Sequence, residues 1–151
     1  MYRMTLRYKA STTSTDLIEL CSKLQVKLNF IGFKNKIPKK LTRGGYIINE
    51  HNSTDKQGAN TINHWVGFYV IKAGASPKQC LYFDSYGFHP SECIVNLAHT
   101  EGLNVVYNTT DYQGLQEGGC GYYTVYFLHL CQKNKIRTYS LMDKEFKDLA
   151  S

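Results

Sequence analysis

The sequence predicts an α+β fold in which a mixed or antiparallel central sheet packs against a buried helix. Residues 64–72 and 80–86 are both rich in aromatic and β-branched side chains, and a short turn region containing Gly and Pro separates them, which is typical of adjacent antiparallel strands. Residues 119–132 are apolar around nearly the whole circumference of a helix, so we expect that helix to be buried. With 151 residues and 42% hydrophobic content, the chain is long enough to form one domain with its own core.

The first third of the chain predicts a helix, a loop and a short strand. Leucines recur at helical spacing within residues 15–28, and Ser14 or Thr15 can cap the first turn, which predicts an amphipathic helix. A segment rich in Lys and Gly follows and is expected to be a loop that leads into a short strand at 46–48. Residues 49–60 are polar and are expected to form another loop.

The second half adds a helix and a strand before the buried helix, and a further helix after it. Pro90 is suited to a first helical turn, so we expect a helix from there to about His99 and a third strand at 105–107. A last amphipathic helix is expected from 141 to 149. These elements predict one domain with three parts: a basic, helical N-terminal part (about 1–45), a core (about 46–135) and a C-terminal helix (about 140–150).

The net charge of +6 is distributed unevenly along the chain. Residues 1–43 contain ten Lys or Arg and only two acidic residues. Clustered cationic groups gain affinity for polyanions by releasing phosphate counterions, so this segment is expected to be either a DNA-binding surface or a solvated basic face. The candidates for nucleic-acid contact are Lys34, Lys36, Lys39, Lys40 and Arg43.

The cysteine content and hydropathy limit the class of protein further. Five cysteines, an odd number with no CxxC pair, predict reduced thiols in an intracellular protein. Cys80, His89, Cys93 and His99 have a spacing that fits no compact zinc knuckle, so no metal site is expected. No apolar run approaches the roughly 20 residues needed to cross a membrane. Residues 1–16 also lack an apolar signal core, so we expect a protein that is neither secreted nor held in a membrane.

Cys120 stands at the glycine-rich start of the predicted buried helix and is the candidate nucleophile. A thiol attacks a carbonyl as the thiolate, and an ordinary thiol pKa near 8.5 leaves little thiolate at neutral pH. A helix N-terminus and a neighbouring imidazolium both favour the thiolate. Gly118, Gly119 and Gly121 would allow a substrate backbone to approach the sulfur closely.

Three residues earlier in the chain complete a candidate hydrolase site. His64 opens an apolar strand and is the candidate base, and Asp84 would orient it through the other ring nitrogen. The Gln113 side-chain amide and the Cys120 backbone N–H would stabilise the oxyanion. Each residue has an ordinary structural alternative, as a core thiol, a core histidine or the end of a strand, and it is their conjunction that indicates catalysis.

The segments HW at 64–65, YFDSYGF at 82–88 and QGLQEGGCG at 113–121 resemble the adenovirus endopeptidases (adenains) and, more distantly, the SUMO-specific proteases of the same clan. The resemblance implies a papain-like fold and a Cys-His-Asp triad with a Gln in the oxyanion hole. It also implies cleavage after small residues, at Gly-Gly or Gly-X sites. Trp65 would then form part of the roof of a narrow cleft or belong to the core, and Gly119 would contact the substrate.

Two departures refine the resemblance. Asp84 replaces the Glu of the adenovirus enzymes and is closer to the SUMO proteases, and residues 102–112 contain no cysteine to receive a disulfide-linked activating peptide. The resemblance therefore favours a maturation protease of a virophage, a polinton-like element or another small double-stranded DNA virus. Such an enzyme would cut capsid or core precursors in the virion interior, the cytoplasmic viral factory or the nucleus.

The resemblance also bears on partners and leaves other functions open. It implies a monomer that needs no cofactor for its chemistry and has no membrane partner. DNA would stimulate its activity. Three alternatives remain: a protease acting on SUMO or ubiquitin conjugates, an acyltransferase, and a catalytically silent DNA-binding module on the same scaffold.

Overall fold

A computed structural model describes residues 13–50, 64–72, 78–113, 119–133 and 144 of the chain. The described elements are, in chain order, α1 (Ser14–Lys23), β1 (Leu28–Phe33), the short 3-10 helix η1 (Lys34–Lys36), β2 (Gly44–Asn49), β3 (Trp65–Ile71), β4 (Gln79–Phe83), α2 (Glu92–Thr100), β5 (Asn104–Tyr107) and α3 (Cys120–Gln132).

The strands form one mixed sheet in the order β1-β2-β3-β4-β5. The three central strands are antiparallel to one another, whereas β1 pairs with β2, and β5 with β4, in parallel. Val70 pairs with Cys80, and Gly67 with Phe83. The prediction that 64–72 and 80–86 contain adjacent antiparallel strands is therefore confirmed.

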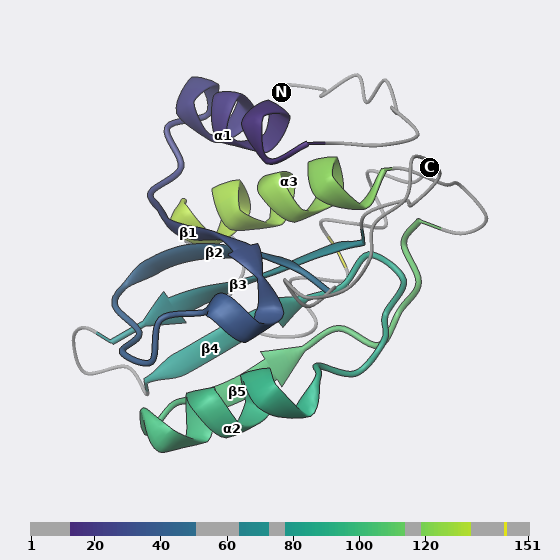
Figure 1. Ribbon diagram of the computed structural model, residues 1–151. Coiled ribbons are helices and arrows are strands. Elements are labelled where there is room, and N and C mark those ends of the chain that lie inside the picture. Colours follow the sequence, from purple (N-terminus) through teal and green to yellow (C-terminus); the bar gives the residue numbers. More distant parts are fainter. Residues whose placement is uncertain (1–12, 51–63, 73–77, 114–118, 134–143, 145–151) are drawn as a thin grey trace.

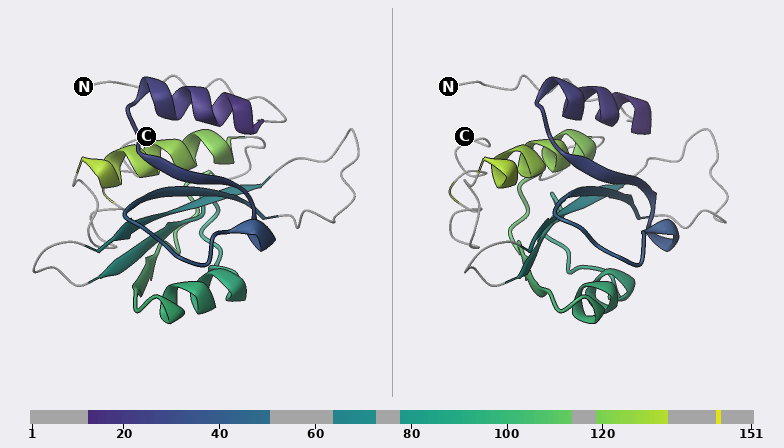
Figure 2. Two further views of the ribbon diagram at one scale, coloured as in Figure 1. Left: turned by 60° about the vertical axis from the view of Figure 1, so that its left-hand side comes forward. Right: turned by 90° about the vertical axis from the view of Figure 1, so that its left-hand side faces the viewer.

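Helices cover both faces of the sheet, and the strands alternate their side chains between the two (Figures 1 and 2). Trp65 and Tyr69 of β3 belong to the core cluster formed with α3 and α1, and α1 lies across α3 on the side away from the sheet. Val66 and Phe68 belong to the cluster on the opposite face, which α2 covers. Because α3 is enclosed between α1 and the sheet, it is buried nearly all round, as its composition predicts.

Helix α1 ends five residues earlier than predicted, because the chain turns into a left-handed conformation at Gln25 (φ +56°). The N–H groups of Gln25 and Val26 bond to the carbonyls of Ser22 and Cys21, which is the hydrogen-bond pattern of a Schellman motif. Gly or Asn normally occupies the left-handed position, so the sequence carries no signal for this stop. The Gln132 side chain of α3 also donates to the Gln25 carbonyl and supports the turn.

The early end of α1 releases residues for β1, which the sequence analysis placed partly in the helix and partly in a loop. All six residues of β1 are half-buried, since it is an edge strand. The helix predicted from Pro90 begins at Glu92 and ends at Thr100. The helix predicted at 141–149 lies outside the described residues except for position 144. Within the described ranges, no helix has the length and apolar character needed to span a membrane.

Candidate active site

Cys120 is the first residue of α3, at the point where the helix meets the start of β3. Cys120 is only 4% exposed, and its Sγ accepts a hydrogen bond from the Trp65 backbone N–H at 3.3 Å. The N–H groups of a first helical turn and the helix dipole favour negative charge at this position. The backbone of β3 and the N-terminus of α3 therefore both direct N–H donors toward the region of this sulfur.

His64 lies between the Cys120 thiol and the Asp84 carboxylate. Its Nε2 lies 3.2 Å from Asp84 Oδ2, and its ring is also hydrogen-bonded to Cys120, which leaves Nδ1 to face the thiol. Burial alone would lower the pKa of His64, but the hydrogen bonds and negative charges of Asp84 and Cys120 outweigh it and raise this pKa to about 10. The imidazole is therefore set to be protonated beside the sulfur.

Asp84 is fixed by its own turn and by a buried asparagine that the sequence analysis missed. Its Oδ1 accepts the Tyr86 N–H at 2.9 Å. The amide of Asn108, which is 0% exposed, accepts from the Asp84 N–H at 3.0 Å and donates to the Asp84 carbonyl at 2.6 Å. Asn108 directly follows Tyr107, the last residue of β5, which pairs with Tyr82 of β4, and its side chain continues the bonding between the two strands beyond that pair. This contact orients Asp84 but leaves no local trace in the sequence.

Gln113 is brought to the turn that carries the acid. Its Oε1 accepts the Ser85 hydroxyl at 2.5 Å, and its Nε2 donates to the Tyr86 hydroxyl at 3.1 Å. The Tyr86 ring in turn packs against the His64 ring, with 5.4 Å between their centroids. The structure thus places Gln113 in a buried network beside the triad, and its function as an oxyanion donor stays a prediction.

A close approach of α3 to β3 helps to position Cys120 relative to His64. The Thr124 hydroxyl, one turn beyond Cys120, donates to the Cys120 carbonyl at 2.8 Å and contacts the Trp65 carbonyl at 3.3 Å. A Cβ at Gly67 would lie 2.5 Å from the methyl carbon of Thr124, so only glycine permits this approach. Neither Gly67 nor Thr124 was predicted, because their roles depend on a contact between distant segments.

Glu50 is a further acid close to the triad that the sequence analysis placed in a polar loop. Its backbone N–H donates to the His64 carbonyl at 3.0 Å, and its carboxylate accepts the Tyr82 hydroxyl at 3.4 Å. Burial raises the pKa of Glu50, the charges of His64 and Lys34 lower it, and the charge of Asp84 raises it. Glu50 is therefore coupled electrostatically to the triad.

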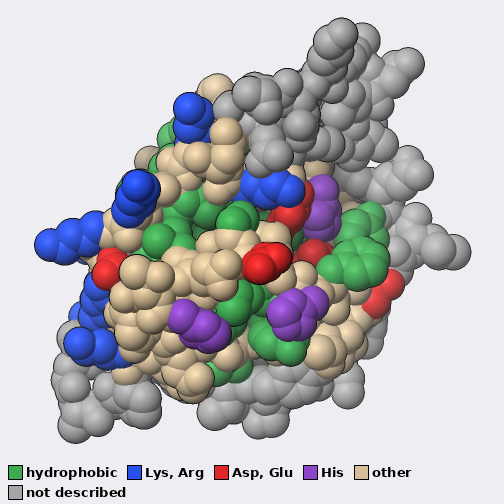
Figure 3. Space-filling model, turned by 60° about the horizontal axis from the view of Figure 1, so that its bottom comes forward, with side chains coloured by type: hydrophobic (Ala, Val, Ile, Leu, Met, Phe, Trp, Pro, Cys, Tyr) green, Lys and Arg blue, Asp and Glu red, His purple; other side chains and the backbone are tan. Residues whose placement is uncertain are grey.

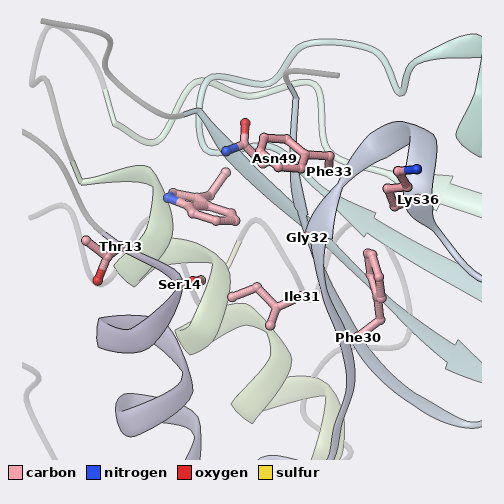
Figure 4. A pocket seen from close by; sticks show the side chains of 9 residues that line it. Thr13, Ser14, Phe30, Ile31, Gly32, Phe33, Lys36 and Asn49 are labelled. Carbon is pink, nitrogen blue, oxygen red and sulfur yellow. The ribbon is translucent and has the colours of Figure 1, made fainter. Parts of the chain in front are cut away.

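A hollow of about 540 Å³ lies between edge strand β1 and the start of α1 and is bordered by Trp65. Figure 4 shows Ile31 projecting from β1 toward Ser14, whereas Phe30 lies on the opposite side of the strand. The residues that line the hollow are Thr13, Ser14, Phe30, Ile31, Gly32, Phe33, Lys36, Asn49 and Trp65. Trp65 borders the hollow, and its backbone N–H donates to Sγ, so Trp65 connects the hollow to Cys120. The Trp65 residue is only 3% exposed, and Gly119 is the buried N-cap of α3, so their predicted contacts with substrate stay predictions.

The basic candidates lie in one segment between β1 and β2. Lys34 and Lys36 belong to η1, and Lys36, Lys39, Lys40 and Arg43 are exposed. Figure 3 shows Lys and Arg side chains toward one side of a face of the molecule rather than spread evenly over it. Within the described part of the chain, no group of three or more His, Cys, Asp or Glu side chains is placed to hold a metal ion.

Solved structures with a similar fold include a crystal structure of the ASFV pS273R protease, with a TM-score of 0.60 and 13% identity over 95% of this chain and 67% of that chain. A selenomethionine crystal structure of the same protease gives a TM-score of 0.53 and 15% identity over 95% of this chain and 68% of that chain. No family model and no curated protein matches the sequence. The likeness shows the fold: a papain-like α+β cysteine protease fold, as predicted.

Proposed function

We propose that the protein is a viral cysteine endopeptidase with Cys120 as nucleophile, His64 as base and Asp84 as the orienting acid. The observation that carries the proposal is the position of Sγ, which contacts both the Trp65 N–H and the His64 ring, while the other ring nitrogen of His64 faces Asp84. The likeness of the fold to the ASFV pS273R protease supports it.

The reaction proceeds by acyl transfer. The Cys120 thiolate attacks the scissile carbonyl carbon, and the Cys120 N–H and the Gln113 amide stabilise the oxyanion that forms. His64 then donates its proton to the leaving nitrogen as the C–N bond breaks, which leaves a thioester. Water, deprotonated by His64, then attacks the thioester carbonyl. As the C–S bond breaks, the acid product leaves, and the Cys120 thiolate and the protonated imidazole are restored. An amine that replaced this water would give an acyltransferase instead.

The substrates we propose are capsid or core precursors, cut after small residues such as Gly-Gly or Gly-X during virion maturation. The hollow between β1 and α1 would hold the segment that precedes the cut, since Trp65 borders the hollow and its backbone N–H donates to Cys120 Sγ. DNA bound by the basic segment between β1 and β2 would concentrate enzyme and precursor on the same polyanion. The resemblance of the sequence motifs to adenains motivates these finer assignments.

The test compares the wild type with Cys120→Ala and with Cys93→Ala, which removes an exposed thiol on α2. Each is incubated with a pool of Gly-Gly and Gly-X peptides and with SUMO and ubiquitin C-terminal reporters, and the cuts are mapped by mass spectrometry. We expect cleavage by the wild type and Cys93→Ala only. Equal cleavage by Cys120→Ala would refute the assignment, and strong preference for the reporters would favour the deconjugating alternative. Salt-sensitive DNA binding with no turnover would favour a silent binding module.

A further inference from the structure

A row of aromatic rings leads from the catalytic imidazole to solvent. The Tyr86 ring centroid lies 5.4 Å from that of His64, and the Phe88 centroid lies 6.3 Å from that of Tyr86. Phe88 is 67% exposed, and among the described residues the other exposed large apolar side chain is Ile18 of α1, at 47%. Because two thirds of Phe88 is exposed, most of its apolar surface is available to a ligand.

The turn that holds Asp84 also fixes the position of Phe88. The Gly87 N–H donates to the Asp84 carbonyl at 2.8 Å, and Gly87 adopts a left-handed conformation with φ +77°. A Cβ at Gly87 would lie 2.7 Å from the Thr109 carbonyl oxygen, so the turn is packed tightly against the segment that follows β5. Phe88 is therefore presented at a defined place relative to His64.

The chemistry of acyl transfer determines which part of a substrate passes the aromatic rings of Tyr86 and Phe88. His64 must reach the leaving nitrogen to protonate it, so the residues that follow the scissile bond run past the imidazole. The segment that precedes the bond stays attached to Cys120 Sγ as the acyl group, and Sγ contacts Trp65, which borders the hollow. The rings of Tyr86 and Phe88 are therefore next to the leaving segment.

We propose that Tyr86 and Phe88 form an apolar subsite for the leaving segment of the substrate, which selects a leucine or an aromatic side chain among the first residues after the cut. This inference rests on the proposed peptidase function. Filling such a subsite with an apolar side chain is expected to change kcat/KM by about tenfold, the lower end of what one apolar contact discriminates.

The test uses two peptides that are identical up to the cut and carry either Leu or Ser at the second position after it. A coumarin amide with the same acyl part reports the catalytic centre without any leaving peptide. We expect the wild type to prefer the Leu peptide about tenfold, Phe88→Ala to reduce that ratio to about one, and the matched control Ile18→Ala to retain it.

The outcomes separate the two proposals. A Leu preference that survives in Phe88→Ala, or a wild type that cleaves both peptides equally, would overturn the subsite while coumarin turnover still supported the peptidase. Loss of coumarin turnover together with both peptides in Phe88→Ala would show that Phe88 is structural, and would also overturn it. A wild type inactive on all three substrates would refute the peptidase itself.

Discussion

Replacing Gly67 with alanine should separate the nucleophile from its base without altering either residue. The added Cβ would lie 2.5 Å from Thr124 Cγ2 and 3.1 Å from the Tyr46 carbonyl oxygen. Both distances are shorter than those at which a Cβ ordinarily contacts another atom. Helix α3 must then move away from β3. Because Thr124 lies one turn beyond Cys120, that movement also displaces Sγ from the Trp65 N–H.

The expected loss of unfolding free energy for Gly67→Ala is about 1–3 kcal/mol, the usual cost of overpacking a core. Thr124→Ser removes the clashing methyl group but keeps the hydroxyl that bonds to the Cys120 carbonyl. Alone it should cost about 0.5–1.5 kcal/mol, as for other losses of one buried methyl group. We expect the double variant to lose at least about 1 kcal/mol less unfolding free energy than the sum of the losses in the two single variants. Recovery should be partial, since the contact with the Tyr46 carbonyl remains.

The assay is urea denaturation of the four proteins in this cycle, together with kcat/KM on one cleaved peptide. Gly102→Ala is the control, because no atom lies within 4 Å of an added Cβ there, so its cost comes from its own left-handed backbone (φ +71°) and not from a clash. Thr124→Ser should not rescue Gly102→Ala. Strict additivity between Gly67→Ala and Thr124→Ser, in stability and in kcat/KM, would refute the claim that this contact sets the position of Cys120.

Three further predictions concern the acid and the imidazole. Asn108→Ala should lower the unfolding free energy by about 1–3 kcal/mol and remove most of the activity, because it leaves the buried backbone groups of Asp84 without these hydrogen bonds. A folded Asn108→Ala variant with wild-type kcat/KM would contradict this. Because the pKa of His64 is raised to about 10, the charged ring stabilises the fold fully below about pH 6.5 and loses that effect as pH rises to about 10. The difference in unfolding free energy between the wild type and His64→Gln should therefore shrink over that range, and a constant difference would count against the ion pair. Glu50→Gln removes a negative charge coupled to His64, so the alkaline limb of the kcat/KM profile, which reports the coupled Cys120 and His64 pair, should move to lower pH; an unmoved or raised limb would exclude this coupling.

The parts of the site that could be predicted are those with local signals. The start of α3 at Cys120 follows from glycines before a long apolar run, and the pairing of β3 with β4 follows from two aromatic-rich segments around a turn. These local patterns place His64, Asp84 and Cys120 at the ends of adjoining elements.

The parts that could not be predicted depend on contacts between distant segments or on unusual backbone choices. Gln25 ends α1 in a left-handed conformation that glycine usually adopts, so the end of α1 and the edge strand β1 were both missed. Asn108 replaces one step of a strand ladder, and Gly67 makes room for Thr124, and neither role shows in the residues beside it. Sequence patterns thus indicated the candidate catalytic residues, whereas the residues that hold them in place emerged only from the packing.

The catalytic assignment is tested most directly by measuring the rate at which iodoacetamide alkylates each cysteine, by peptide mapping, at about pH 6, well below the ordinary thiol pKa. Burial raises the pKa of Cys21 to about 11 and that of Cys80 to about 12, so both should be inert, and exposed Cys93 serves as the reference thiol in the same chain. If His64 and Cys120 form an ion pair, Cys120 should react faster than Cys93 at this pH, and His64→Ala should abolish its advantage. Slower reaction of Cys120 than of Cys93, in both the wild type and His64→Ala, would contradict its role as the nucleophile.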